Sequence, residues 1–186
     1  MAAKSVGSIY QLKIALKDSK PPIWRRVLVP GSFSLGKLHH VIQIAMGWDD
    51  AHMHQFNVNG NFYGVPSPED WEPMKNETRF RLETVAPPVK SKFIYEYDFG
   101  DSWIHTVTVE KILPPEPGAK YPQCIAGKRA CPPEDVGGVW GYEEFLMAMN
   151  DPDHEEHESF MEWVGGEFDP EEFDPEEVNE ELQRMK

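Results

Sequence analysis

Histidines and acidic residues stand at spacings that could hold a metal ion. His52 and His54 are two residues apart in the stretch HMH, so in a β-strand both side chains point to the same side. Two neutral imidazoles on one strand can chelate one divalent ion. A third ligand is needed, and we expect His105 or Asp98 to supply it across a sheet. The alternative is that the histidines are hydrogen-bonded groups at the border of an apolar face.

The stretch YDFGDSWIH, residues 97–105, brings aromatic rings, two carboxylates and a histidine close together. If Gly100 and Asp101 are the central residues of a two-residue turn, the flanking strands pair Glu96 with His105. Such a pair would raise the pKa of the histidine and orient its ring. We expect a ligand-binding rim here. Its residues are His52, Asp98, Asp101, Trp103 and His105. The alternative is an ordinary turn with packed rings and a surface Glu96–His105 pair.

Two cysteines, Cys124 and Cys131, precede two histidines, His154 and His157. The four side chains could ligate zinc, and the two histidines would share one face of a predicted helix. However, six residues separate the cysteines, whereas compact zinc sites use about two to four. Packed or paired thiols are therefore favoured. We predict no cofactor, with zinc or another divalent metal as the alternative.

The N-terminal third carries clear strand and helix patterns. Apolar and polar residues alternate over 8–18 and 23–30, which predicts two strands of a hairpin. Apolar residues at helical spacing then predict a helix over 35–46. Ser34 is suited to the N-cap of this helix and Gly47 to its termination.

The middle of the chain predicts further strands and the end predicts helices. Residues 52–65 form a hairpin signal, because Asn59 and Gly60 both tolerate the positive φ of a type I′ turn. Strands are also predicted over 78–84, 91–100 and 102–113. A helix is predicted over 141–150, and two more are predicted to begin at Asp151-Pro152 and Asp174-Pro175.

This order of elements predicts an α+β protein. It reads β-β-α-β-β-β-β, then C-terminal helices, and indicates a mixed β-sheet with a crossing helix, similar to a β-grasp arrangement. At 186 residues the chain has the size of a single domain. Within 1–186 we expect the sheet and its helix over 1–112, an ordered loop rich in proline and glycine over 113–138, and an acidic helical part over 139–186.

The charge of the chain is concentrated at its C-terminal end. The net charge is −14, and residues 151–186 hold 15 of the 32 acidic residues but 2 of the 18 basic ones. Such a segment repels phosphate backbones, which makes nucleic acid an unlikely partner. The longest apolar stretch, VIQIAMGW, is much shorter than the ~20 residues of a membrane-spanning helix, and no secretory signal precedes it. We therefore expect a cytoplasmic protein without membrane contact.

Four blocks of the sequence resemble the plasmid pRiA-type ORF-three-like family. They are PPIWRRVLVPGSFSLGKLHHVIQIAMGWDDAHMHQF, YDFGDSWIHTV, CIAGKRACPPEDVGGVWGYEEF and HEEHESFMEWVGGEFDPEEFD. The resemblance covers roughly residues 8–175 and implies a single α+β domain with no established catalysis. Some members are labelled transposon-passenger TnpR-like, which implies a resolvase-like role.

Three functions are compatible with these features. The favoured one is a non-enzymatic module that binds a protein or small-molecule ligand of unknown identity, with no catalytic residues assigned. The second is a metal-dependent hydrolase or nuclease with His52, His54, His105 and an aspartate as ligands. The third is an accessory role in mobile-element DNA transactions, although no recombinase set of serine, tyrosine, arginine and histidine side chains stands out.

Overall fold

Apolar alternation near the N-terminus produces a hairpin in the middle of the sheet. In the computed structural model, which describes residues 7–69 and 73–185, β1 (Ile9–Leu16) pairs antiparallel with β2 (Trp24–Pro30). Leu12 and Ile14 are fully buried, while Lys13 between them is half-buried. The predicted hairpin is confirmed, and one of its faces forms the floor of the core.

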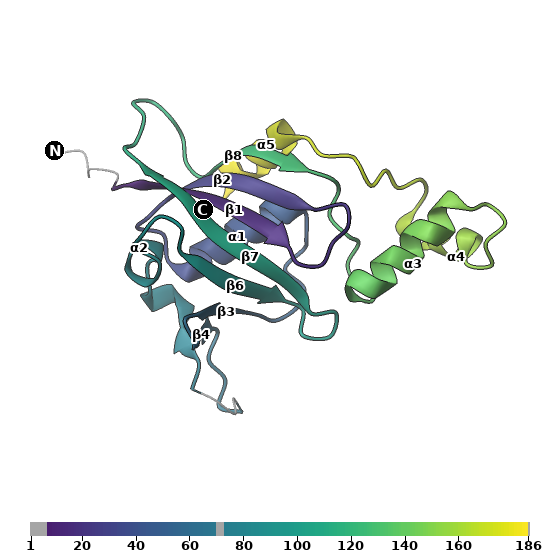
Figure 1. The fold of residues 1–186 in the computed structure, drawn as a ribbon, viewed down its shortest axis with the longest axis horizontal. Coiled ribbons are helices and arrows are strands. Elements are labelled where there is room, and N and C mark those ends of the chain that lie inside the picture. Colours follow the sequence, from purple (N-terminus) through teal and green to yellow (C-terminus); the bar gives the residue numbers. More distant parts are fainter. Residues whose placement is uncertain (1–6, 70–72, 186) are drawn as a thin grey trace.

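Helix α1 (Leu35–Met46) lies across that face of the sheet (Figure 1). The Ser34 hydroxyl accepts a hydrogen bond from the Lys37 N–H at 3.2 Å, and Gly47 ends the helix with a φ of 104°. These are the predicted cap and terminator. The apolar stripe of α1 is buried against the strands, and most of its energy comes from this packing rather than from helix propensity.

Within residues 7–69 and 73–185, eight strands form one mixed sheet in the order β5-β4-β3-β6-β7-β1-β2-β8. All neighbouring pairs are antiparallel except β4 with β5, which are parallel. The remaining strands are β3 (His54–Val58), β4 (Asn61–Gly64), β5 (Lys75–Asn76), β6 (Lys92–Tyr97), β7 (Trp103–Leu113) and β8 (Gln123–Lys128). Positive φ values at Asn59 and Gly60 confirm the turn between β3 and β4. The α+β class is confirmed, and the likeness to a β-grasp arrangement stays a prediction.

Two predictions about the middle of the chain are wrong. The predicted strand over 78–84 is a short 3₁₀ helix, η1 (Glu77–Arg79), followed by α2 (Leu82–Val85). Its backbone bonds to the start of α1 instead of a sheet: the Leu35 N–H donates to the Phe80 carbonyl. The segment 113–138, predicted as a loop, contains β8. Pairing with β2 stabilises β8 as a strand, although the local composition does not indicate one.

The pairing of β6 with β7 also differs from the predicted pairing. Tyr97 lies opposite Trp103 and Tyr95 lies opposite His105, so the expected pair of Glu96 with His105 is wrong. The connection is longer than two residues because Asp98 adopts a left-handed φ of 55° and its carboxylate accepts the Gly100 N–H at 2.9 Å. Aspartate tolerates this conformation better than most residues.

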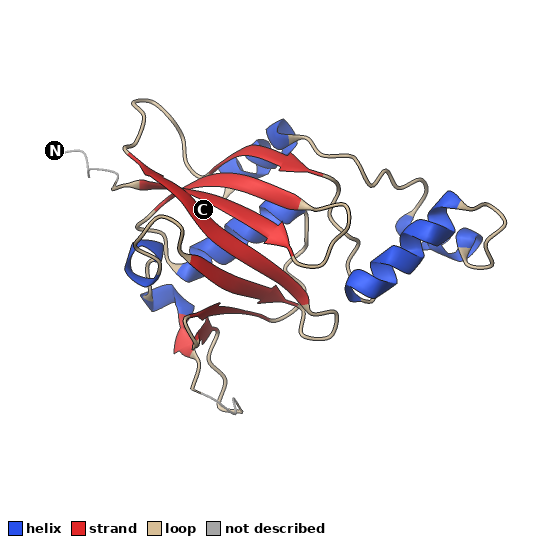
Figure 2. Cartoon of the chain, in the orientation of Figure 1, coloured by secondary structure: helices blue, strands red, loops and turns tan. Residues whose placement is uncertain are grey.

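The C-terminal helices occupy two places. Figure 2 shows α3 (Gly138–Asn150) and α4 (His157–Val164) standing beside the sheet, whereas α5 (Pro175–Arg184) returns to β8. Asp174 caps α5 as predicted. The predicted helix start at Asp151-Pro152 is wrong, because the Asp151 side chain accepts the Asp153 N–H and forms a turn. Within the described residues, no helix combines the length and apolar character needed to cross a bilayer.

Candidate functional site

A cavity of about 620 Å³ opens beside α1 and the start of β3. One part of its wall consists of imidazole and carboxylate side chains. They are His39, His40, Asp50, His52, His54 and Glu77. The rest of the wall is largely apolar and includes the exposed side chains of Met53, Val65 and Phe99. A concave, mostly apolar wall with a few convergent polar groups is typical of small-ligand sites.

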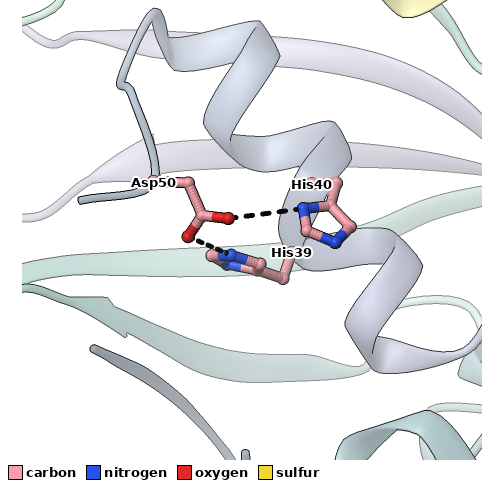
Figure 3. Close-up of side chains that lie close together, drawn as sticks. All are labelled: His39, His40 and Asp50. Carbon is pink, nitrogen blue, oxygen red and sulfur yellow. Dashed lines mark hydrogen bonds and ion pairs between the residues drawn. The ribbon is translucent and has the colours of Figure 1, made fainter. Parts of the chain in front are cut away.

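His39, His40 and Asp50 form the tightest group in this wall, and we name these three residues the pocket cluster. Asp50 lies between the two rings (Figure 3), with Oδ1 2.8 Å from His39 Nε2 and Oδ2 3.6 Å from His40 Nδ1. The Asp50 N–H donates to Gln43 Oε1, which ties the loop after α1 back onto the helix. One ligand atom from each residue lies within 4.8 Å of the others.

The hydrogen bonds around His39 fix its tautomer. Because Gln43 Oε1 accepts the Asp50 N–H, its Nε2 donates to the Tyr95 hydroxyl at 2.9 Å. That hydroxyl in turn donates to His39 Nδ1 at 2.8 Å, so the ring proton lies on Nε2 and points to Asp50. Burial, together with the nearby His54, lowers the pKa of His39 to about 4. His39 is therefore neutral at pH 7.

His54 and Glu77 form a buried pair beside the pocket cluster. His54 Nε2 lies 2.8 Å from Glu77 Oε2, and both side chains are less than one-tenth exposed. The His54 ring stacks on His39 with centroids 3.4 Å apart and planes 4° from parallel.

The residues of the predicted rim lie in different surroundings. His52 and Asp98 are neighbours, with Nε2 and Oδ2 3.7 Å apart, and the Asp101 carboxylate accepts the Gly137 N–H at 3.0 Å. Trp103 and His105 are fully buried on the face that α1 covers, and neither lines the cavity. His105 packs edge-on against Trp48, and burial lowers its pKa to about 4.

The predicted metal ligands separate in the same way. His52 and His54 both line the cavity, whereas His105 lies in the core. Cys124 and Cys131 are free thiols, and burial raises the pKa of each. His154 lies before α4 rather than in it, so the predicted shared helix face with His157 is wrong. Among the described residues, the two clusters with three ligand atoms within 4.8 Å contain no cysteine.

Sequence reasoning missed His39, His40 and Asp50 although a signal for them exists. The segment 39–54 reads HHVIQIAMGWDDAHMH and holds four of the chain's seven histidines. Attention to this density, rather than to the HMH triplet alone, would have pointed to the pocket cluster. No comparable signal marks Glu77, because the fold brings it from a distant segment to His54.

Comparisons with known proteins place the chain in a family. The model of the plasmid pRiA4b ORF-3-like protein family matches residues 8–177. The chain belongs to this family. It is 40% identical over 162 residues to the uncharacterized protein y4hQ of Sinorhizobium fredii, covering 86% of this chain and 82% of the relative. The crystal structure of MM3350 from Methanosarcina mazei Go1, a protein of unknown function, superposes with a TM-score of 0.85 at 43% identity, covering 92% of this chain and 97% of that one. These descriptions state no activity, so function has to be argued from the site.

Proposed function

We propose that this member of the family binds a divalent transition-metal ion of the zinc class through the pocket cluster and presents it to a small ligand. The observation that carries the proposal is the convergence of ligand atoms from His39, His40 and Asp50 within 4.8 Å in the wall of an open cavity. Two imidazoles and one carboxylate leave coordination positions free for a ligand or water.

The donor chemistry fits such an ion. Imidazole nitrogens and carboxylate oxygens both ligate zinc at about 2.0–2.2 Å, and one such atom from each of the three residues lies within 4.8 Å of the others. Ligation through His39 Nε2 would move the ring proton to Nδ1. The Tyr95 oxygen would then accept a hydrogen bond from the Nδ1–H group, because a phenol can act as donor or acceptor. Such outer hydrogen bonds orient ligating histidines in metal sites.

The apolar wall supports a ligand with both polar and apolar parts. Met53 and Val65 are each 70% exposed and Phe99 is 42% exposed, all three beside the polar wall. Side chains of this kind favour an apolar group of the ligand, while the ion would bind its polar end. This agrees with the prediction of a small-molecule binding module.

The test is metal binding by untagged, full-length protein after removal of metals by dialysis against a chelator. We expect the pocket cluster to bind one equivalent of Zn²⁺ or Co²⁺, with a Co²⁺ absorption spectrum typical of nitrogen and oxygen ligands. His40→Ala removes a half-exposed ligand and should weaken binding at least about 10-fold. His154→Ala, a histidine outside the cavity, is the matched control. Equal affinity of both variants and the parent would overturn the proposal.

A second candidate function is metal-dependent hydrolysis at the same site. The observation that favours it is the buried His54–Glu77 pair, since a carboxylate-oriented histidine can act as a general base. A panel of activated ester and phosphate substrates, assayed with and without Zn²⁺, tests this role. Turnover that survives His54→Gln would contradict it.

The remaining expectations stay proposals. The acidic C-terminal segment supports the view that nucleic acid is not a partner, and this in turn weighs against a role in mobile-element DNA transactions. The expected cytoplasmic location also stays a proposal.

A further inference from the structure

A second group of ligand atoms lies around the imidazole ring of His52. Its Nε2 lies 3.0 Å from Asp135 Oδ1, 3.7 Å from Asp98 Oδ2 and 3.8 Å from Glu134 Oε2. Among the described residues, this nitrogen is buried and has no hydrogen-bond partner. We name His52, Asp98, Glu134 and Asp135 the loop cluster.

Two of these carboxylates are already oriented through their other oxygen. Asp98 Oδ1 accepts the Gly100 N–H at 2.9 Å. Glu134 Oε1 accepts the Asp49 N–H at 2.9 Å and the Tyr97 hydroxyl at 3.0 Å, and Glu134 Oε2 lies 3.3 Å from the same hydroxyl. Each carboxylate therefore turns its second oxygen toward His52. Outer-shell hydrogen bonds of this kind orient metal ligands before an ion binds.

The loop that carries Glu134 and Asp135 is fixed against the turn that carries Asp98. The Gly137 N–H donates to Asp101 Oδ2 at 3.0 Å, and a Cβ added at Gly138 would lie 2.5 Å from the Asp101 carbonyl oxygen. The two segments thus touch at backbone distance. Asp101 is a positioning residue for the loop cluster.

The charge of the loop cluster needs compensation. Three carboxylate oxygens lie within 3.8 Å of one nitrogen. Carboxylates that share a site repel one another, and a divalent cation among them offsets this repulsion. Carboxylates favour manganese, magnesium and calcium, whereas imidazole disfavours the last two, so the mixed set suits manganese.

We infer that His52, Asp98 and Asp135, whose ligand atoms lie within 4.8 Å of one another, form a second divalent-cation site of the manganese type, with Glu134 beside it. It is independent of the zinc-class site proposed at the pocket cluster, since the two share no ligand. The cation ties the 98–102 turn to the loop before α3, and it flanks the cavity because His52 also lines the cavity wall.

The test is Mn²⁺ titration of the untagged, chelator-treated full-length chain, followed by electron paramagnetic resonance of the free ion and by calorimetry. Asp135→Asn changes an exposed side chain, so it should not affect folding, and we expect it to weaken Mn²⁺ binding at least about 10-fold. Asp153→Asn, an exposed aspartate outside the cluster, should bind as the parent does. His52→Gln should also weaken binding.

The outcomes separate the two proposed sites. His40→Ala should weaken zinc binding at the pocket cluster and leave the Mn²⁺ affinity of the loop cluster unchanged. Asp135→Asn should weaken Mn²⁺ binding and leave the zinc affinity of the pocket cluster unchanged. If the parent binds no Mn²⁺ below millimolar concentration, or if Asp135→Asn and His52→Gln both bind Mn²⁺ as the parent does, the loop cluster is an ion pair only and the inference is overturned.

Discussion

The pocket cluster and the loop cluster are neighbours built in opposite ways. The first takes its ligand atoms from α1 and the loop that follows it, within twelve residues from His39 to Asp50. The second gathers His52 with Asp98, Glu134 and Asp135 from three distant segments. The first is rich in nitrogen and the second in oxygen. The difference teaches that ligands from one short segment and ligands from distant segments can offer distinct cation chemistry at neighbouring positions.

Two tyrosines of β6 make the contrast concrete. Tyr95 and Tyr97 are two residues apart and both are fully buried on the same face. The Tyr95 hydroxyl donates to His39, whereas the Tyr97 hydroxyl donates to Glu134. One strand therefore supports both clusters, each through a separate hydroxyl group.

The largest expected effect comes from separating the two segments of the loop cluster. In Gly138→Ala, a Cβ would meet the Asp101 carbonyl oxygen at 2.5 Å, at a residue with a φ of 70°. Clash and strain should cost about 3 kcal/mol, which undocking of the loop would relieve. Because Mn²⁺ binds only when the loop docks again, its affinity should fall about 100-fold. Calorimetry measures this change, and zinc binding at the pocket cluster should be unaffected.

Gly118→Ala is the matched control for this prediction. Gly118 also has a positive φ, of 80°, but among the residues that the structure describes no heavy atom beyond its chain neighbours lies within 4 Å of its added Cβ. It carries the backbone strain without the clash. Equal Mn²⁺ affinity of Gly138→Ala and Gly118→Ala would break the claim that loop docking builds the loop cluster.

His105 provides a reference imidazole outside both clusters. Its pKa is lowered from 6.5 to about 4 by burial, so the unfolded chain binds more protons than the folded one between these pH values. Stability contributed by the neutral ring is present above pH 6.5 and is lost as the pH falls toward 4. Between pH 7 and pH 5 the loss from this residue should be about 2 kcal/mol.

Urea unfolding of the chelator-treated protein at both pH values measures this effect. His105→Gln should lose about 2 kcal/mol less than the parent on acidification, whatever its stability at pH 7. His154→Gln, outside the core, should follow the parent. If His105→Gln and the parent lose the same free energy of unfolding between pH 7 and pH 5, the buried ring does not cause the loss of stability in acid.

The smallest expected effects come from the two hydroxyls of β6. Tyr95→Phe should weaken zinc binding about 10-fold and leave Mn²⁺ binding unchanged, because it removes the hydroxyl that bonds to His39. Tyr97→Phe should weaken Mn²⁺ binding about 10-fold and leave zinc binding unchanged, because it removes the hydroxyl that bonds to Glu134. Tyr121→Phe, whose hydroxyl accepts the Glu116 N–H in an exposed loop, is the control. If either variant changes both metals equally, the clusters are coupled rather than separate.

Much of the fold could be predicted because its signals are local. The caps Ser34 and Gly47 define α1 from adjacent residues, Asn59-Gly60 sets a hairpin, and Asp174 begins α5. In each case the hydrogen bonds or φ values that fix the structure belong to residues within a few positions of one another.

The rest depended on partners that are distant along the chain. The Pro- and Gly-rich composition around β8 gives no strand signal, and pairing with β2 creates the strand. The pairing of β6 with β7 was mispredicted because the turn begins one residue earlier, at Asp98. One changed turn length altered which side chains share a face, and so it moved Trp103 and His105 from the expected rim into the core.

The candidate site shows the same division. The sequence by itself determined that imidazoles and carboxylates crowd residues 39–54, and that α1 would carry some of them. Only the tertiary structure decided that Asp50 folds back between His39 and His40, that Glu77 reaches His54, and that Glu134 and Asp135 face His52. The physical reason is that each position in the sequence gives its own side-chain type, whereas proximity across a sheet or between loops is set by the packing of the whole chain.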